Sequence, residues 1–170
     1  MEERLVACLY ADVSGYCRLI NRDVGHTIRT LRAYRTLMAG LVMKYAGRVV
    51  DVAGDSLLAE FPTAGGAVEC AVEIQRELAA RNATLPPDRR VEFRIGIELG
   101  QVVVDRGRLY GDAVNIAARV QEAGAPRTIR VAESAYDRIN GSPSMRLDYL
   151  GEHTAKNMER PLRVYQVADQ

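Results

Sequence analysis

The chain is poor in the residues that would mark a disulfide scaffold, a cysteine metal site or a charged binding surface. Its 170 residues include three cysteines, Cys8, Cys17 and Cys70, an odd number without metal-ligand spacing, so we expect reduced thiols and a cytoplasmic location. The formal net charge is only +1, which gives no support for nucleic acid or an anionic membrane as the main partner. No segment approaches the roughly 20 apolar residues that cross a bilayer, so we expect no membrane partner.

Other familiar signals are missing as well. His26 and His153 each stand alone, outside any ligand pattern. The first residues are acidic and precede only a short apolar run, which argues against a secretory signal, and no repeat or linker divides the chain. What is present, 48% apolar and 26% charged residues, is typical of a soluble globular protein. We expect a single domain over residues 1–170.

The spacing of apolar residues predicts alternating strands and helices. An apolar run ends at Asp12 and is followed by Ser-Gly, which indicates a buried strand and a turn. Residues 26–47 carry apolar side chains at helical spacing, and Gly47 is expected to end that helix. The other expected elements are a hairpin over 48–61 with a turn at 53–55, a helix over 63–83, a loop over 85–90, two strands over 91–107 with a turn at 99–101, a helix over 111–124, a strand over 128–132, and strands over 147–157 and 162–168.

This order of elements favours the α+β class. Hairpins mixed with helices predict a mostly antiparallel sheet with helices packed on one face. The first elements follow the split βαβ pattern of ferredoxin-like folds.

Two aspartates stand where this arrangement would bring them together. Asp12 ends the first strand and Asp55 lies in the turn of the first hairpin, which lie side by side in a ferredoxin-like sheet. Two adjacent carboxylates are costly to ionise without a cation, and their oxygens suit Mg²⁺ or Mn²⁺ held together with phosphates. The plain alternative is that both residues only form turns, where aspartate is common.

Five blocks in order resemble class III nucleotidyl cyclases. They are LYADVSGYCRLI, GRVVDVAGDSLLAEFP, FRIGIELGQVVV, LYGDAVNIAARV and AKNMERPLRVYQV, and they span roughly residues 5–167. The resemblance implies the ferredoxin-like class III cyclase fold and a bare catalytic domain. It also implies that a ribose 3′-oxygen attacks the α-phosphorus of a nucleoside triphosphate, which gives a 3′,5′-cyclic nucleotide and pyrophosphate.

The resemblance assigns roles to individual residues. Asp12 and Asp55 match the metal-binding aspartates, and Val13 would add a backbone carbonyl ligand. Two Mg²⁺ or Mn²⁺ ions per active site are implied. The remaining matches are Arg94 for the triphosphate, Asn115 for the ribose, Arg119 for the transition-state phosphate and Lys156 for the phosphates, with Tyr16 close enough to the metal loop to touch the triphosphate.

Each of these matches also has an ordinary structural interpretation. Arg94 could be a strand-surface arginine, and Lys156 a solvated loop lysine. Asn115 and Arg119 are four residues apart, so they share one helix face that could simply be polar. In the family, the metal aspartates and the Asn/Arg pair of one site come from different subunits. The resemblance therefore implies a head-to-tail homodimer with two shared active sites.

Two positions differ from the adenylate cyclase pattern and concern the base. Asp51 stands where adenylate cyclases have a lysine, and Arg108 occupies the second base-reading position. Asp51 as a hydrogen-bond acceptor beside Arg108 as a donor fits the keto–imide edge of guanine or uracil. The same arrangement leaves groups unpaired against adenine or cytosine, so ATP and CTP are disfavoured. The bulk of Arg108, with Tyr110 nearby, favours the smaller uracil. Alternatively, Asp51 and Arg108 pair with each other and read nothing.

The resulting hypothesis is a uridylate cyclase that converts UTP to 3′,5′-cyclic UMP. The short format resembles the pyrimidine cyclases of bacterial Pycsar antiphage systems, which implies a separate effector activated by the cyclic nucleotide. Three alternatives stay open: a guanylate or adenylate cyclase, an inactive nucleotide-binding dimerisation module, and a diguanylate-type cyclase, although no GGDEF-like stretch is present.

Overall fold

A computed structural model of the chain describes residues 1–139, 145–154 and 158–168. These residues form one eight-stranded sheet in the order β2-β3-β1-β4-β6-β8-β7, with β5 paired to β4 off this path. Every pairing in the described sheet is antiparallel except β4 with β6, which confirms the predicted α+β class. The strands are β1 (Glu2–Val13), β2 (Arg48–Ala53), β3 (Ser56–Phe61), β4 (Phe93–Asp105), β5 (Arg108–Tyr110), β6 (Ile129–Ala132), β7 (Leu147–His153) and β8 (Leu162–Val167).

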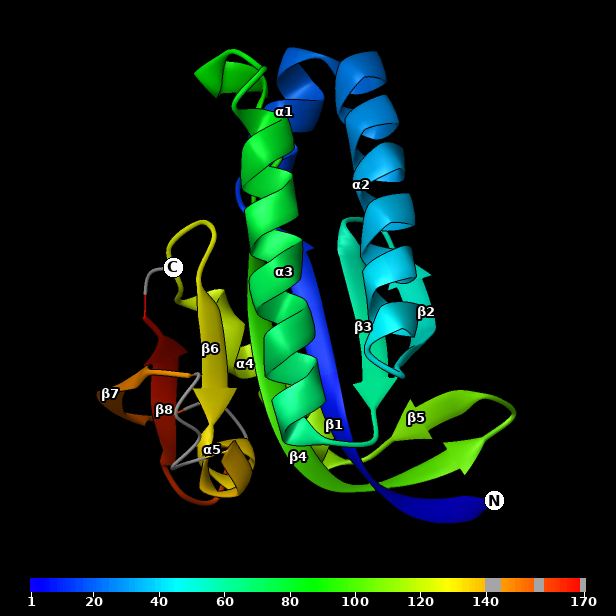
Figure 1. Cartoon of the computed structure of the whole chain (residues 1–170), viewed down its shortest axis with the longest axis vertical. Helices are drawn as coiled ribbons and strands as arrows, with labels where there is room; N and C mark the ends of the chain where they lie inside the picture. The colour runs from blue at the N-terminus through cyan, green and yellow to red at the C-terminus, as the bar shows by residue number, and fades with distance from the viewer. Residues whose placement is uncertain (140–144, 155–157, 169–170) are drawn as a thin grey trace.

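Helices cover both faces of the sheet, which corrects the expectation that they share one face. Figure 1 shows the long α2 and α3 side by side in front of the sheet. On β1, Ala7 and Leu9 belong to the cluster under α2 and α3, whereas Cys8 packs with Ala113 and Ala117 of α4 on the other face. The helices are α1 (Tyr16–Arg22), α2 (Val24–Lys44), α3 (Ala64–Asn82), α4 (Asp112–Glu122), α5 (Glu133–Ile139) and the 3₁₀ turn η1 (Pro87–Arg89).

The long helices start at side-chain caps. Asp23 accepts a hydrogen bond from the His26 backbone N–H at 3.0 Å, and Thr63 accepts one from Gly66 at 3.0 Å. Helix α2, which the sequence predicts over residues 26–47, therefore begins at Val24. None of the helices in the described ranges is long and apolar enough to span a bilayer.

Strand β4 is continuous, so the predicted turn at residues 99–101 is wrong. Gly96 and Gly100 of this strand instead allow α4 to pack closely against it. A Cβ on Gly96 would lie 2.0 Å from the Ala117 carbonyl oxygen, and one on Gly100 would lie 3.0 Å from the Ala113 Cβ. The chain reverses later, at Arg106 and Gly107, which both have positive φ, and β5 follows.

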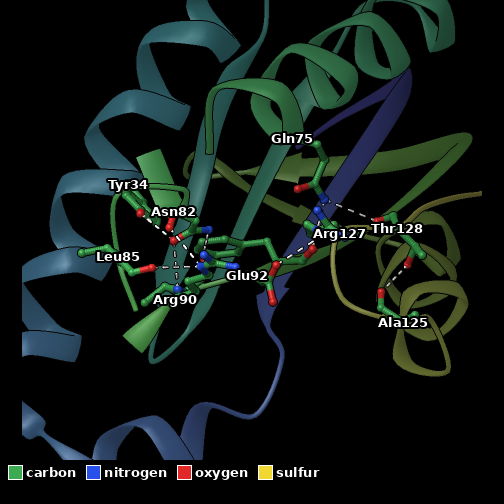
Figure 2. Close-up of polar contacts among 11 residues, drawn as sticks. Tyr34, Gln75, Asn82, Leu85, Arg90, Glu92, Ala125, Arg127 and Thr128 are labelled. Atoms are coloured by element: carbon green, nitrogen blue, oxygen red, sulfur yellow. Dashed lines mark hydrogen bonds and ion pairs between the residues drawn. The ribbon is translucent and has the colours of Figure 1, made fainter. Parts of the chain in front are cut away.

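A buried polar cluster fixes the segment that leads into β4 (Figure 2). Tyr34 on α2 donates to Asn82 Oδ1 at 2.7 Å, and Asn82 in turn bonds both the N–H and the carbonyl of Val91. Two turns earlier on α3, Gln75 donates to the Phe93 carbonyl at 3.0 Å. The start of β4 is therefore held from α2 and α3.

Candidate active site

Asp12 lies at the centre of the candidate site because of its place in the sheet. It is next to last in β1, where its register partners are Ser56 on β3 and Arg94 on β4. The β2–β3 turn carries Asp55 to the same end of the sheet, and the Val13 N–H donates to Asp55 Oδ2 at 3.3 Å. Sheet pairing thus brings the two predicted metal aspartates together, as the sequence pattern indicated.

The turn that presents Asp55 is held from the helical layer. Gly54 has a φ of 56°, a conformation that favours glycine. Its carbonyl accepts a hydrogen bond from Arg35 of α2. The position of the Asp55 carboxylate therefore depends on α2 as well as on the hairpin.

Both carboxylate oxygens of Asp12 have protein partners. The Nε and Nη2 atoms of Arg94 lie 3.1 Å from Oδ1, and Gln121 Nε2 donates to Oδ2 at 3.0 Å. Arg94 Nη1 also donates to the Glu122 carbonyl at 2.5 Å. The structure thus places Arg94 directly against Asp12, one of the two predicted metal ligands, and it adds Gln121, which sequence reasoning missed. Its signal was a glutamine four residues after Ala117 on the buried face of α4.

The electrostatic environment of Asp12 and Asp55 favours a bound cation. Burial raises the pKa of Asp12, the positive charge of Arg94 and the hydrogen bond from Gln121 oppose that rise, and the negative charge of Asp55 adds to it. The net direction is upward. A divalent cation between the carboxylates would relieve both the desolvation and the repulsion.

The donor atoms fit a hard cation. Two carboxylates and the Val13 carbonyl offer only oxygen ligands, the type that Mg²⁺ and Mn²⁺ prefer. Among the described residues, no cluster of three or more His, Cys, Asp or Glu side chains could hold a metal ion. Ions held by Asp12 and Asp55 would therefore need water or substrate phosphates to complete their coordination.

Asn115 and Arg119 belong to a pocket whose lining does not include Asp12 or Asp55. Both line a pocket of about 640 Å³ beside α4, whose other walls include Glu98 and the charged residues Glu133 and Arg160. No hydrogen bond or ion pair in the described part of the chain joins either residue to Asp12 or Asp55. Within one chain, the two predicted halves of the site are therefore not joined by a polar contact between the described residues.

Glu98 is a second residue that sequence reasoning missed. It is only 3% exposed, and its Oε1 accepts hydrogen bonds from the backbone N–H groups of Leu99 at 2.8 Å and Ala135 at 3.2 Å. Burial raises the pKa of Glu98 to about 7. Its signal was an acidic residue inside the apolar run of β4.

The predicted base-reading residues lie on two strands that do not pair with each other in the described sheet. Asp51 is on β2 and Arg108 on β5, and both side chains are exposed. The two strands are linked where the Arg48 guanidinium donates to the Gly107 carbonyl at 3.3 Å. Within the described ranges, no ion pair joins Asp51 to Arg108.

Tyr16 and Lys156 are the two remaining predicted substrate contacts. Tyr16 is the first residue of α1, a short helix absent from the expected elements, and it packs against the main core. That places it four residues after Asp12, at the start of the helix that follows β1. Lys156 lies outside the described residues.

Comparison with known proteins gives a match over nearly the whole chain. The sequence model of the family described as "Adenylate and Guanylate cyclase catalytic domain" matches residues 2–168. A protein named "Putative adenylate cyclase 3" from Rhizobium meliloti is 37% identical over 97% of the chain, and an "Adenylate cyclase" from Streptomyces coelicolor is 33% identical over 80%. The matched regions cover only 28% and 34% of those two proteins.

Solved structures agree with the fold. A crystal structure from Silicibacter pomeroyi, titled as an adenylate/guanylate cyclase/hydrolase, has a TM-score of 0.89 at 36% identity and covers 99% of both chains. The adenylyl cyclase CyaB from P. aeruginosa has a TM-score of 0.85 at 20% identity, a likeness that concerns the fold alone.

Proposed function

The chain belongs to the adenylate and guanylate cyclase catalytic domain family, and from this premise we propose that it converts UTP to 3′,5′-cyclic UMP and pyrophosphate. The observation that carries the cyclase chemistry is the pairing of Asp12 and Asp55 at one end of the sheet, with Arg94 3.1 Å from Asp12. Carboxylates beside a guanidinium at this end suit two metal ions and a triphosphate.

The chain's own residues have defined parts in this reaction. Asp12, Asp55 and the Val13 carbonyl would hold two Mg²⁺ or Mn²⁺ ions, which when bound would lower the pKa of the ribose 3′-hydroxyl and neutralise the triphosphate. Arg94 contacts phosphate oxygens. The new bond joins the 3′-oxygen to the α-phosphorus, the bond from that phosphorus to the bridging oxygen breaks, and the 3′-hydroxyl proton leaves. Positioning and charge stabilisation supply most of the acceleration.

The second half of each site comes from a partner copy in this proposal. Asn115 orients the ribose, and Arg119 and Lys156 stabilise charge on the phosphates. The support is that the pocket lined by Asn115 and Arg119 does not include Asp12 or Asp55 of the same chain. A head-to-tail homodimer with two shared sites would bring each pocket to the partner's metal pair.

Asp51 and Arg108 select the base in this proposal. Asp51 accepts from the imide N–H and Arg108 donates to the neighbouring carbonyl, an arrangement that guanine and uracil satisfy. The support is that both side chains are exposed and that Arg48 of β2 bonds the carbonyl of Gly107, the residue before β5. Among the described residues no ion pair joins Asp51 to Arg108. The bulk of Arg108 then favours uracil. The cyclic UMP would act as an antiphage signal through a separate effector.

A guanylate cyclase is the second candidate, and one observation favours it. Tyr110, which was expected to narrow the base pocket, is 53% exposed. If it stays out of the pocket in the dimer, only Arg108 limits the space for a purine. GTP would then satisfy Asp51 and Arg108 as well as UTP does.

Product analysis with single nucleotides tests the proposal. Purified protein with Mn²⁺ is incubated separately with ATP, GTP, CTP and UTP, products are identified by mass spectrometry, and the Asp55→Ala variant serves as the blank. Cyclic UMP that disappears in the blank supports the proposal. Cyclic GMP keeps the base-edge argument and overturns the size argument, cyclic AMP or CMP overturns both, and no product from any nucleotide favours an inactive binding module.

A further inference from the structure

Gln121 is a polar side chain buried at a metal aspartate, and the mechanism above gives it no role. It lies in the last turn of α4 and is 1% exposed. Its Nε2 atom donates to Asp12 Oδ2 at 3.0 Å and to the Ala118 carbonyl at 2.9 Å, while its Oε1 atom is buried and has no hydrogen-bond partner among the described residues. An unpaired buried acceptor costs free energy, so packing alone does not explain a glutamine here.

The two oxygens of Asp12 have partners of different charge. Oδ1 faces the Arg94 guanidinium, a cation that competes with a metal ion for this atom. Oδ2 faces the neutral amide of Gln121. Each carboxylate oxygen has two lone pairs, so Oδ2 can accept a metal ion and still keep its hydrogen bond to Gln121.

We infer that Gln121 is a positioning residue for Asp12: it holds the carboxylate in its metal-binding orientation when Arg94 gives up Oδ1 to a divalent cation. Arg94 keeps an anchor in that exchange, because it also donates to the carbonyl of Glu122, the residue after Gln121. The last turn of α4 thus controls both partners of Asp12. The inference rests on the proposed function, since it concerns the same metal pair.

Replacing Gln121 with leucine removes the donor and keeps the volume similar. The free Mn²⁺ signal in electron paramagnetic resonance gives binding of Mn²⁺ in the presence of pyrophosphate, and cyclase assays give the Mn²⁺ concentration for half-maximal rate. Loss of a residue that orients a metal ligand costs about 10- to 100-fold in metal affinity, and we expect a weakening of this size for Gln121→Leu. The KM for the nucleotide at saturating Mn²⁺ should change much less.

Gln75→Leu is the matched control. Gln75 is also a partly buried glutamine that donates to two backbone carbonyls, those of Phe93 and Thr128, but it does not touch Asp12. It should lower the thermal midpoint and leave Mn²⁺ binding unchanged. If Gln121→Leu does not fold, Gln121→Asn, which keeps a shorter amide, replaces it and should weaken Mn²⁺ binding in the same direction.

The outcomes separate this inference from the proposed function. A folded Gln121 variant that binds Mn²⁺ like the wild type, or a Gln75→Leu variant weakened to the same extent, overturns the positioning role while the cyclase proposal stands. A wild type that neither binds Mn²⁺ nor makes a cyclic nucleotide overturns the proposed function, and the role of Gln121 with it. Weakened Mn²⁺ binding confined to the Gln121 variants supports the inference.

Discussion

Single side chains set the chemistry of the site through their partners. Asp12 is charged beside Asp55 yet partly buried, and Arg94 compensates that charge in the metal-free chain. Asp51 and Arg108 are exposed and have no partner of this kind within the described ranges, so their hydrogen-bonding capacity is available to a ligand. In the proposed function, base selection and metal binding therefore involve different residues and should be changeable independently.

Reversing the two base-reading residues should reverse the base preference. In Asp51→Lys with Arg108→Asp, the donor and acceptor exchange places, which fits the amino and ring-nitrogen edge of adenine or cytosine. We expect kcat/KM for UTP to fall about 10- to 100-fold relative to that for ATP or CTP, the usual cost of unpaired buried polar groups. Competition assays with paired nucleotides measure this ratio. Arg106→Asp, in the adjacent turn, is the charge control, and an unchanged preference in the double variant would show that the two residues read nothing.

Glu98 makes stability depend on pH in a predictable direction. Its pKa rises from an ordinary 4.5 to about 7 in the folded state, so the folded chain binds its proton more tightly than the unfolded chain. The contribution of this group to stability is complete below pH 4.5 and is lost as the pH rises through 7. Glu98→Gln can still accept from Leu99 and Ala135, and it should be more stable than the wild type by about 1 to 3 kcal/mol at pH 8.

Urea unfolding at pH 5 and pH 8 tests this expectation. The difference between Glu98→Gln and the wild type should be small at pH 5 and should grow with pH. Glu98→Leu leaves the Leu99 and Ala135 N–H groups unpaired and should be destabilised at both values. A constant difference between Glu98→Gln and the wild type at the two pH values would contradict the ionisation argument.

Side chains at strand ends were predictable from the sequence, and buried polar ones were not. Asp12 and Asp55 follow apolar runs and turns, so a local pattern placed them at one end of the sheet. Gln121 and Glu98 are defined by burial against distant segments, Asp12 for one and Ala135 for the other. Their sequence signal is only a polar residue at an apolar position, which does not identify its partner.

At the level of elements, β4 shows why a glycine is ambiguous in a sequence. The sequence pattern predicts a turn at Gly100, but this residue lies within a continuous strand, where the absence of a Cβ lets Ala113 approach. The reversal occurs at Arg106 and Gly107 instead. The same close approach places α4 on the face opposite α2 and α3, which periodicity within each helix could not reveal. The short helices α1 and α5 were missed because seven residues carry little periodic signal.

The Asn82 cluster should contribute measurably to the stability of the layer that holds β4. Asn82→Leu leaves the Tyr34 hydroxyl and both backbone groups of Val91 without their partner (Figure 2). We expect a loss of about 2 to 4 kcal/mol in the free energy of unfolding. Tyr34→Phe removes one hydrogen bond and should cost about 1 kcal/mol. Urea unfolding compares the two, and equal losses would mean that the Val91 groups find other partners.

At the scale of the whole molecule, the arrangement of the two half-sites has a consequence for mixtures of variants. In the proposed homodimer, Asp55→Ala removes metal binding and Arg119→Ala removes transition-state stabilisation, so each variant alone should be nearly inactive. A heterodimer of the two places both changes in one site and leaves the other site intact. Random mixing gives heterodimers as roughly half of all dimers, and the activity should recover to about a quarter of the wild-type value.

The mixture experiment also separates shared sites from sites within one chain. If each chain held a complete site, both variants would stay inactive in any mixture, because every site would carry one of the two changes. Asp55→Ala mixed with Asp12→Ala is the control, since both changes then affect the same half-site and the heterodimer has no intact site. Recovery in the first mixture and not in the second would place the Asn115–Arg119 pocket of one subunit against the Asp12–Asp55 pair of the other. We expect that result because the pocket of Asn115 and Arg119 does not include the Asp12–Asp55 pair of the same chain.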